Sequence, residues 1–126
     1  MYEVVIPKKF ILGDVTTPWY PQGQTPGELP FYKNNIKQCS KTNIVTTNSF
    51  IFEEKVMKNF KNNLNSTIFD METAAYAQIA FKNNIPFNVV KCVSDVVGSD
   101  VENNDDINNR IKKSGLIAYK KMIELI

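Results

Sequence analysis

Three segments of the chain share one pattern, in which a short run of β-branched or aromatic residues ends in polar side chains. These segments are residues 44–49, 66–72 and 86–95. Short apolar runs of this kind, bounded by polar clusters, are typical of buried strands. We therefore expect three buried strands, each with polar side chains at its carboxyl end.

Helical patterns separate these strands. Apolar residues between positions 56 and 64 recur at helical spacing, after two glutamates whose charges suit a helix N-terminus. Residues 73–80 are rich in alanine, and residues 105–125 place apolar side chains roughly on one side of a final helix. Strand and helix in alternation predict an α/β fold, with a mostly parallel sheet flanked by helices.

The N-terminal third follows a different pattern. Residues 2–6 read as a strand and residues 10–12 as a further short one. Residues 18–32 then combine prolines and glycines with aromatic side chains, which predicts a long loop with a functional role. Residues 98–106 are polar and read as a loop before the final helix.

Composition narrows the function classes. A chain of 126 residues fits one domain or part of one. It has neither an apolar run that could span a bilayer nor a signal peptide, so we expect a cytoplasmic protein without membrane contact.

The absence of histidine disfavours zinc and Ser-His chemistry, and we expect neither metal nor cofactor. Net charge of +2 with a single arginine, Arg110, argues against nucleic acid. Cys39 and Cys92 lie far apart, which disfavours a disulfide.

The carboxylates at the strand ends are the candidate chemical groups. In a parallel sheet the carboxyl ends of the strands meet at one edge, so Asp70, Glu72 and Asp95 would converge there. Antiparallel pairing would separate them. Spacing alone favours structural roles for Asp70 and Glu72, because Asp70 could cap the following helix and Glu72 could interact with its dipole.

Three short motifs resemble a known family. Residues 69–75 (FDMETAA), 85–87 (IPF) and 93–95 (VSD) are similar to the 5′-methylthioadenosine/S-adenosylhomocysteine nucleosidases of the nucleoside phosphorylase superfamily. The similarity extends along nearly the whole chain. It implies a phosphorylase-like three-layer α/β/α fold, and hydrolysis of the N-glycosyl bond of an adenine nucleoside.

The resemblance also implies a role for each candidate residue. Glu72, with Asp70 beside it, would bind the ribose hydroxyls, and Met71 would pack against the sugar. The loss of a purine leaves an oxocarbenium-like ribose, so negative charge near the sugar suits the reaction. Around the base, the resemblance assigns residues that stack on it, read its edge or give it a proton: Phe50, Ile51, Ser94 and Asp95. Asp95, held by Ser94, would be the catalytic proton donor to N7.

Several positions depart from the family pattern. Asp70 stands where glutamate is usual, Lys91 where arginine is usual, and Asn48 where the family has an aspartate. Ile107 takes the place of a phenylalanine of the segment over the base. These changes bear on substrate preference.

The resemblance covers only the C-terminal portion of the family domain. Residues 1–126 are therefore expected to form that portion, without the N-terminal segment that supplies the water-activating glutamate. We expect a homodimer, with the loop from Trp19 to Tyr32 as a candidate contact, or association with a polypeptide that supplies the missing half. A nucleoside phosphorylase and a catalytically inactive nucleoside-binding or interaction protein remain the alternatives.

Overall fold

The computed structural model describes residues 1–98 and 104–126 of the chain. Its elements are, in order, β1 (Val4–Val5), β2 (Lys9–Leu12), β3 (Tyr32–Lys33), β4 (Asn43–Thr46), α1 (Glu54–Leu64), β5 (Ser66–Asp70), α2 (Thr73–Lys82), β6 (Lys91–Cys92) and α3 (Asn104–Leu125). The predicted helices are thus confirmed. Within the described part of the chain, no helix has both the length and the apolarity needed to cross a bilayer.

A four-stranded sheet forms the centre of the molecule, with the strand order β3-β2-β4-β5. Strand β4 runs parallel to both of its neighbours, so that Ile44 lies beside Phe10 of β2 and Ile68 of β5. The short strand β3 is antiparallel to β2 and closes one edge. The predicted α/β class is confirmed, with a mixed sheet whose three adjacent strands β2, β4 and β5 are parallel.

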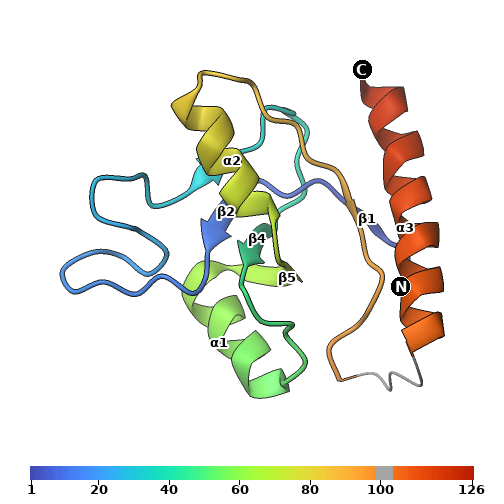
Figure 1. Ribbon diagram of the computed structural model, residues 1–126, viewed down its shortest axis with the longest axis horizontal. Coiled ribbons are helices and arrows are strands. Elements are labelled where there is room, and N and C mark those ends of the chain that lie inside the picture. The colour runs from blue at the N-terminus through green and yellow to red at the C-terminus, as the bar shows by residue number, and fades with distance from the viewer. Residues whose placement is uncertain (99–103) are drawn as a thin grey trace.

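Successive residues of each strand point to opposite faces of the sheet, and a different helix covers each face. Phe10 and Ile44 are fully buried on one face and pack with the alanines of α2. Ile11 and Val45 point to the opposite face and pack with Phe60 of α1. Burying each of these large side chains is worth roughly 1.5–3 kcal/mol relative to exposure. The result is the expected three-layer arrangement, with α2 and α1 on opposite sides of the sheet (Figure 1).

The prediction that residues 86–95 form a further strand of the parallel sheet is wrong. Only Lys91–Cys92 forms a strand, β6, and it pairs antiparallel with β1 in a separate two-stranded sheet. The amide N–H of Val93 donates to the Glu3 carbonyl at 2.9 Å, so this segment is hydrogen-bonded to the chain around β1 and not to the central sheet. The N–H and carbonyl of Val89 are both bonded to the side chain of Asn34, which leaves them unavailable to a neighbouring strand.

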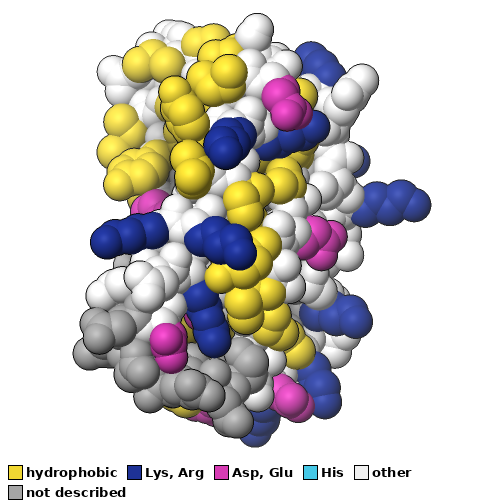
Figure 2. All heavy atoms as spheres, turned by 90° about the vertical axis from the view of Figure 1, so that its right-hand side faces the viewer, with side chains coloured by type: hydrophobic (Ala, Val, Ile, Leu, Met, Phe, Trp, Pro, Cys, Tyr) yellow, Lys and Arg dark blue, Asp and Glu magenta, His cyan; other side chains and the backbone are white. Residues whose placement is uncertain are grey.

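Helix α3 packs on this small sheet and leaves one face open. Its described inner positions include the buried Ser114, whereas several large apolar side chains are more than half exposed. These are Ile111, Leu116, Tyr119 and Ile123. Figure 2 shows a strip of hydrophobic side chains on this side of the molecule, flanked by lysines. An exposed strip of this kind is typical of a surface that another element or chain covers.

Both cysteines are free thiols. Partial burial in β6 raises the pKa of the Cys92 thiol above its ordinary value, because a thiolate would lose solvation there. The reactive thiolate of Cys92 is therefore disfavoured.

Asn34 joins segments that are far apart in the sequence. Its side-chain nitrogen donates to the carbonyls of Pro7 and Val89, both at 2.9 Å, and its oxygen accepts from the N–H groups of Ile36 and Val89. The residue is only 9% exposed. One amide thus satisfies backbone groups of three segments that no strand pairs.

We predict that Asn34→Ala lowers the free energy of unfolding by about 2–4 kcal/mol, because it leaves several buried backbone groups without partners. Urea unfolding followed by circular dichroism measures the change. Asn35→Ala is the matched control, since Asn35 is exposed, and it should lie within about 0.5 kcal/mol of the wild type. Equal stability of the two variants would contradict the role given to Asn34.

Candidate functional site

The carboxylate of Asp70 lies at the carboxyl ends of β4 and β5, where it connects the sheet to α2. The hydroxyl of Thr46 donates to Oδ1 at 2.6 Å, and the N–H of Thr73 donates to Oδ2 at 3.0 Å. The Thr73 hydroxyl also bonds to Oδ2, and the N–H of Ala74 donates to the Thr46 hydroxyl at 2.9 Å. The side chain of Asp70 is only 6% exposed. Asp70 is not the N-cap of α2, which is Glu72, but its carboxylate accepts the N–H of Thr73, the first residue of the helix.

Lys91 of β6 joins Asp70 to Glu72. Its Nζ lies 3.3 Å from Oδ2 of Asp70 and 3.2 Å from Oε1 of Glu72. Glu72 is about half exposed, and its Oε2 accepts the N–H of Met71 at 3.2 Å. Met71 is 50% exposed and does not pack inward. Glu72 and Met71 therefore face outward from the sheet edge. The single ammonium group of Lys91 forms ion pairs with both carboxylates.

Asp95 has its own cation. The Ser94 hydroxyl donates to Oδ2 of Asp95 at 2.9 Å, as the resemblance implies. Nη1 of Arg110, from α3, lies 3.7 Å from Oδ1, and both of these atoms are buried without a hydrogen-bond partner. The side chain of Asp95 is 15% exposed. The carboxylate of Asp95 is thus in contact with two groups of the protein, the Ser94 hydroxyl and the Arg110 guanidinium.

The residues expected around the base lie after β4. The Phe50 side chain is 51% exposed, whereas Ile51 packs partly into the cluster of Ile11, Val45 and Phe60. The N–H of Asn48 donates to Oδ2 of Asp14 at 2.5 Å. This contact ties the segment before Phe50 to the end of β2 and holds it at the same sheet edge as Asp70.

The predicted carboxylates have different ion-pair partners in the structure. Asp70 and Glu72 meet through Lys91, while Asp95 pairs instead with Arg110. Sequence reasoning did not assign Thr46 or Arg110 to the site. A threonine at the end of a buried strand was a usable signal for Thr46, whereas the pairing of Arg110 depends on how α3 packs.

The aromatic loop between β2 and β3 divides into two parts. Phe31 packs partly against the core, and Tyr32 is buried in β3. The preceding part is exposed, and the side chain of Trp19 is 99% exposed. Glu28 anchors this part through an ion pair with Lys82 at the end of α2, at 2.6 Å. The end of the loop thus folds over the core of its own chain, whereas a contact of Trp19 with another chain stays a prediction.

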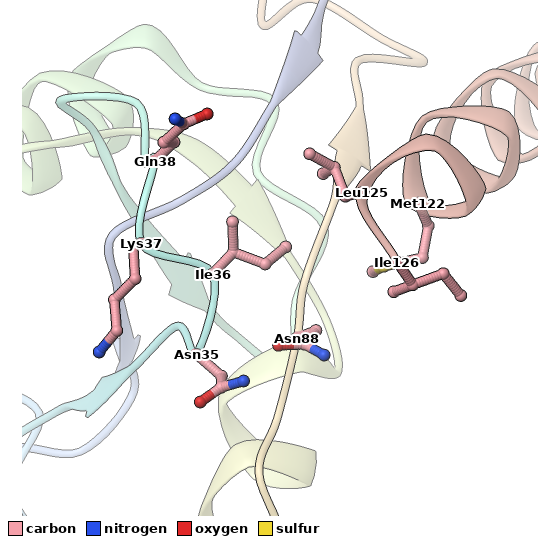
Figure 3. A pocket seen from close by; sticks show the side chains of 8 residues that line it. All are labelled: Asn35, Ile36, Lys37, Gln38, Asn88, Met122, Leu125 and Ile126. Atoms are coloured by element: carbon pink, nitrogen blue, oxygen red, sulfur yellow. The ribbon is translucent and has the colours of Figure 1, made fainter.

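Neither of two hollows on the described surface is lined by a candidate site residue, and the surface holds others. One, of about 390 Å³, lies between the turn at residues 35–38 and the end of α3 (Figure 3). In that view Met122, Leu125 and Ile126 lie across from the turn, and Asn88 lies between them. The second hollow, of about 470 Å³, lies at the amino ends of β2 and β4. Among residues 1–98 and 104–126, no cluster of three or more His, Cys, Asp or Glu side chains could hold a metal ion. The predicted loop at residues 98–106 lies largely outside the described residues.

The comparisons with known proteins decide the family. The model of the phosphorylase superfamily matches residues 2–125. The chain belongs to the phosphorylase superfamily. Among curated relatives, a 5′-methylthioadenosine/S-adenosylhomocysteine nucleosidase of Buchnera aphidicola subsp. Acyrthosiphon pisum is 28% identical over 145 residues, covering 98% of this chain and 62% of that protein. This superfamily member thus spans less than two thirds of the length of that relative.

Solved structures share the fold at lower identity. A nucleosidase from Neisseria meningitidis in complex with methylthio-immucillin-A has a TM-score of 0.79 at 18% identity, and the match covers 98% of this chain and 60% of that one. A futalosine hydrolase of Helicobacter pylori has a TM-score of 0.80 at 16% identity, covering 98% of this chain and 59% of that one. The phosphorylase-superfamily fold is therefore confirmed. Fold alone does not separate these substrates.

We predict that Thr46→Val lowers the free energy of unfolding by about 2–3 kcal/mol, because it removes a hydroxyl that bonds to both Asp70 and the N–H of Ala74. Valine has nearly the same shape, so lost packing contributes little. Thr46→Ser keeps the hydroxyl and should recover most of the difference. Urea titration of both variants measures it, and equal losses would show that packing rather than the hydroxyl matters.

Proposed function

We propose that this chain is the C-terminal portion of a purine nucleoside N-glycosidase that hydrolyses 5′-methylthioadenosine or S-adenosylhomocysteine. The observation that carries the proposal is the similarity to nucleosidases along 98% of the chain, which includes the motifs around Glu72 and Asp95. The outward position of Glu72, Met71 and Phe50 supports it, because a ligand at this edge could reach their side chains.

The chemistry of the reaction suits these groups. Water adds to the anomeric carbon while the bond to the purine nitrogen breaks, so the products are the free base and the thioribose. The sugar gains positive charge in the transition state, and the carboxylate of Glu72 stabilises it. The departing base needs a proton or a hydrogen-bond donor at N7. We assign this role to the protonated carboxyl group of Asp95 after a bound base has displaced Arg110. The proton that Asp95 gives to the base is replaced by the proton that the attacking water loses, so the step is balanced.

A complete enzyme needs more polypeptide than this chain provides. The chain spans about 62% of the curated relative, and none of its carboxylates is assigned to the activation of water. The exposed apolar side chains of α3, such as Leu116 and Tyr119, support the same conclusion, because a further part of the domain would cover them. We place that remaining portion against this face.

The alternative of a binding protein without turnover has one observation in its favour. Arg110 pairs with Asp95 and occupies the carboxylate that would have to contact the base. In that case the chain holds purine nucleosides and releases no base.

Adenine release tests the proposal directly. We expect the chain, co-expressed with the portion of a nucleosidase relative that it does not match, to release adenine from 5′-methylthioadenosine without phosphate. A strict requirement for phosphate would identify a phosphorylase instead. Binding of methylthio-immucillin-A without any release would identify the binding protein, and the absence of both would end the nucleoside proposal.

In the active complex, Asp95→Asn should lower kcat at least about 100-fold, because it removes the proton donor. Glu72→Gln should lower kcat/KM by a similar factor through the loss of charge near the sugar. Glu53→Gln, which removes the same charge from an exposed site before α1, is the matched control and should stay within about twofold of the wild type. Full activity of Asp95→Asn would remove this residue from the chemistry.

We also propose that the exposed tip of the aromatic loop contacts a second polypeptide, in a homodimer or with the missing portion. The full exposure of Trp19 supports this, since large aromatic side chains are enriched at interfaces. Trp19 is the only tryptophan, so its fluorescence reports on this tip alone. A blue shift with rising protein concentration, or on addition of the partner, is expected. A fully solvated emission maximum in the assembled complex would contradict the proposal.

A further inference from the structure

The second hollow, of about 470 Å³, lies at the amino ends of the parallel strands, whereas Asp70 of the candidate site lies at their carboxyl ends. Lys8 and Lys9 lie at the amino end of β2, and Lys41 precedes β4. Lys33 ends the antiparallel strand β3, and Lys37 lies in the turn that follows it. Because β2 and β4 are parallel, these five lysines gather at their amino ends, whereas Asp70 marks the carboxyl ends.

The positive charge of this hollow is not balanced locally. No aspartate or glutamate among the described residues lines it, and none of its five lysines forms an ion pair with a carboxylate of residues 1–98 or 106–126. Lys9 instead places its Nζ 4.2 Å from the centre of the Phe31 ring. The hollow holds five of the chain's 15 Lys and Arg residues, so the remaining ten are outnumbered by 13 Asp and Glu residues. Positive charge is thus concentrated in one concave place, where it focuses the electric field.

The backbone that carries these lysines is firmly held. The N–H of Lys8 donates to the Thr42 carbonyl at 3.1 Å, and the N–H of Asn34 donates to the Lys8 carbonyl at 3.1 Å. The N–H of Ser40 donates to the Ile6 carbonyl at 2.8 Å, while the Ser40 hydroxyl accepts the N–H of Ile6. The buried side chain of Asn34 joins the same segments. The like charges are therefore held together by the fold and cannot move apart through the backbone.

We propose that this hollow binds a compact polyanion, a triphosphate chain or a small polycarboxylate. Lysine ammonium groups bind such ligands as point charges and need no planar acceptor. Ile36 is the only large apolar side chain that lines the hollow, which favours a ligand of dense charge over one with an aromatic ring. This site is separate from the proposed nucleoside site, since the two lie at opposite edges of the sheet, and it does not depend on the proposed function.

Titration calorimetry with tripolyphosphate and with citrate tests the proposal on the full chain, at low salt and at ~0.15 M ionic strength. The test variant is the triple substitution Lys33→Gln, Lys37→Gln and Lys41→Gln. The matched control removes the same three charges from exposed positions of α1, by Lys55→Gln, Lys58→Gln and Lys61→Gln. Circular dichroism checks that both variants keep the fold.

Wild-type protein should bind one ligand saturably at both salt concentrations. The hollow variant should bind at least about tenfold more weakly, and the control should stay within about twofold of the wild type. Tighter binding of tripolyphosphate than of citrate would assign the site to phosphate chains, and equal or tighter binding of citrate would assign it to polycarboxylates. The proposal is overturned if wild type shows no saturable binding at ~0.15 M ionic strength, or if both triple variants weaken binding equally.

Discussion

The buried carboxylate of Asp70 is the constraint on which the arrangement of the sheet edge depends. A charge that is almost fully removed from water must be paired and hydrogen-bonded, and Asp70 meets this requirement with Thr46, Thr73 and Lys91. These three partners belong to β4, α2 and β6, so one side chain holds a strand, a helix and the small second sheet around the end of β5. Removing any of its partners would leave a buried charge less well compensated.

This commitment of Asp70 shapes the candidate site. Its oxygens are occupied by Thr46, Thr73 and Lys91, whereas the side chain of the neighbouring Glu72 is about half exposed. Lys91 touches both carboxylates and couples them electrostatically. Asp95 lies only four residues further along the chain, yet it pairs with Arg110 of α3. Asp70 and Glu72 thus share one lysine, whereas Asp95 pairs with an arginine, so these carboxylates lie in different electrostatic surroundings.

The two ends of the parallel strands differ in charge as well as in chemistry. Asp70 and Glu72 pair with Lys91 near the carboxyl ends. Five lysines without an ion-pair partner among the described side chains gather at the amino ends around a separate hollow. A net charge of +2 conceals this separation. On a third side, the apolar strip of α3 faces outward, which fits a chain that matches only about 62% of a longer relative. The paired carboxylates, the lysine-lined hollow and the apolar face of α3 thus lie on different sides of one small domain.

The sequence by itself determined the elements whose causes are local. Apolar spacing from Val56 to Leu64 and the alanines after Thr73 predicted α1 and α2, because helix periodicity and propensity depend on near neighbours. The FDMETAA motif likewise indicated the superfamily that the family model confirms. Tertiary structure decided the rest. Whether the run before Cys92 joined the parallel sheet depended on β1, nearly 90 residues away, and on the Asn34 amide that occupies Val89. The pairing of Asp95 with Arg110, and the gathering of five lysines from distant segments, likewise depend on long-range packing. Periodicity cannot reveal such contacts, because it records which face a residue occupies and not what lies opposite.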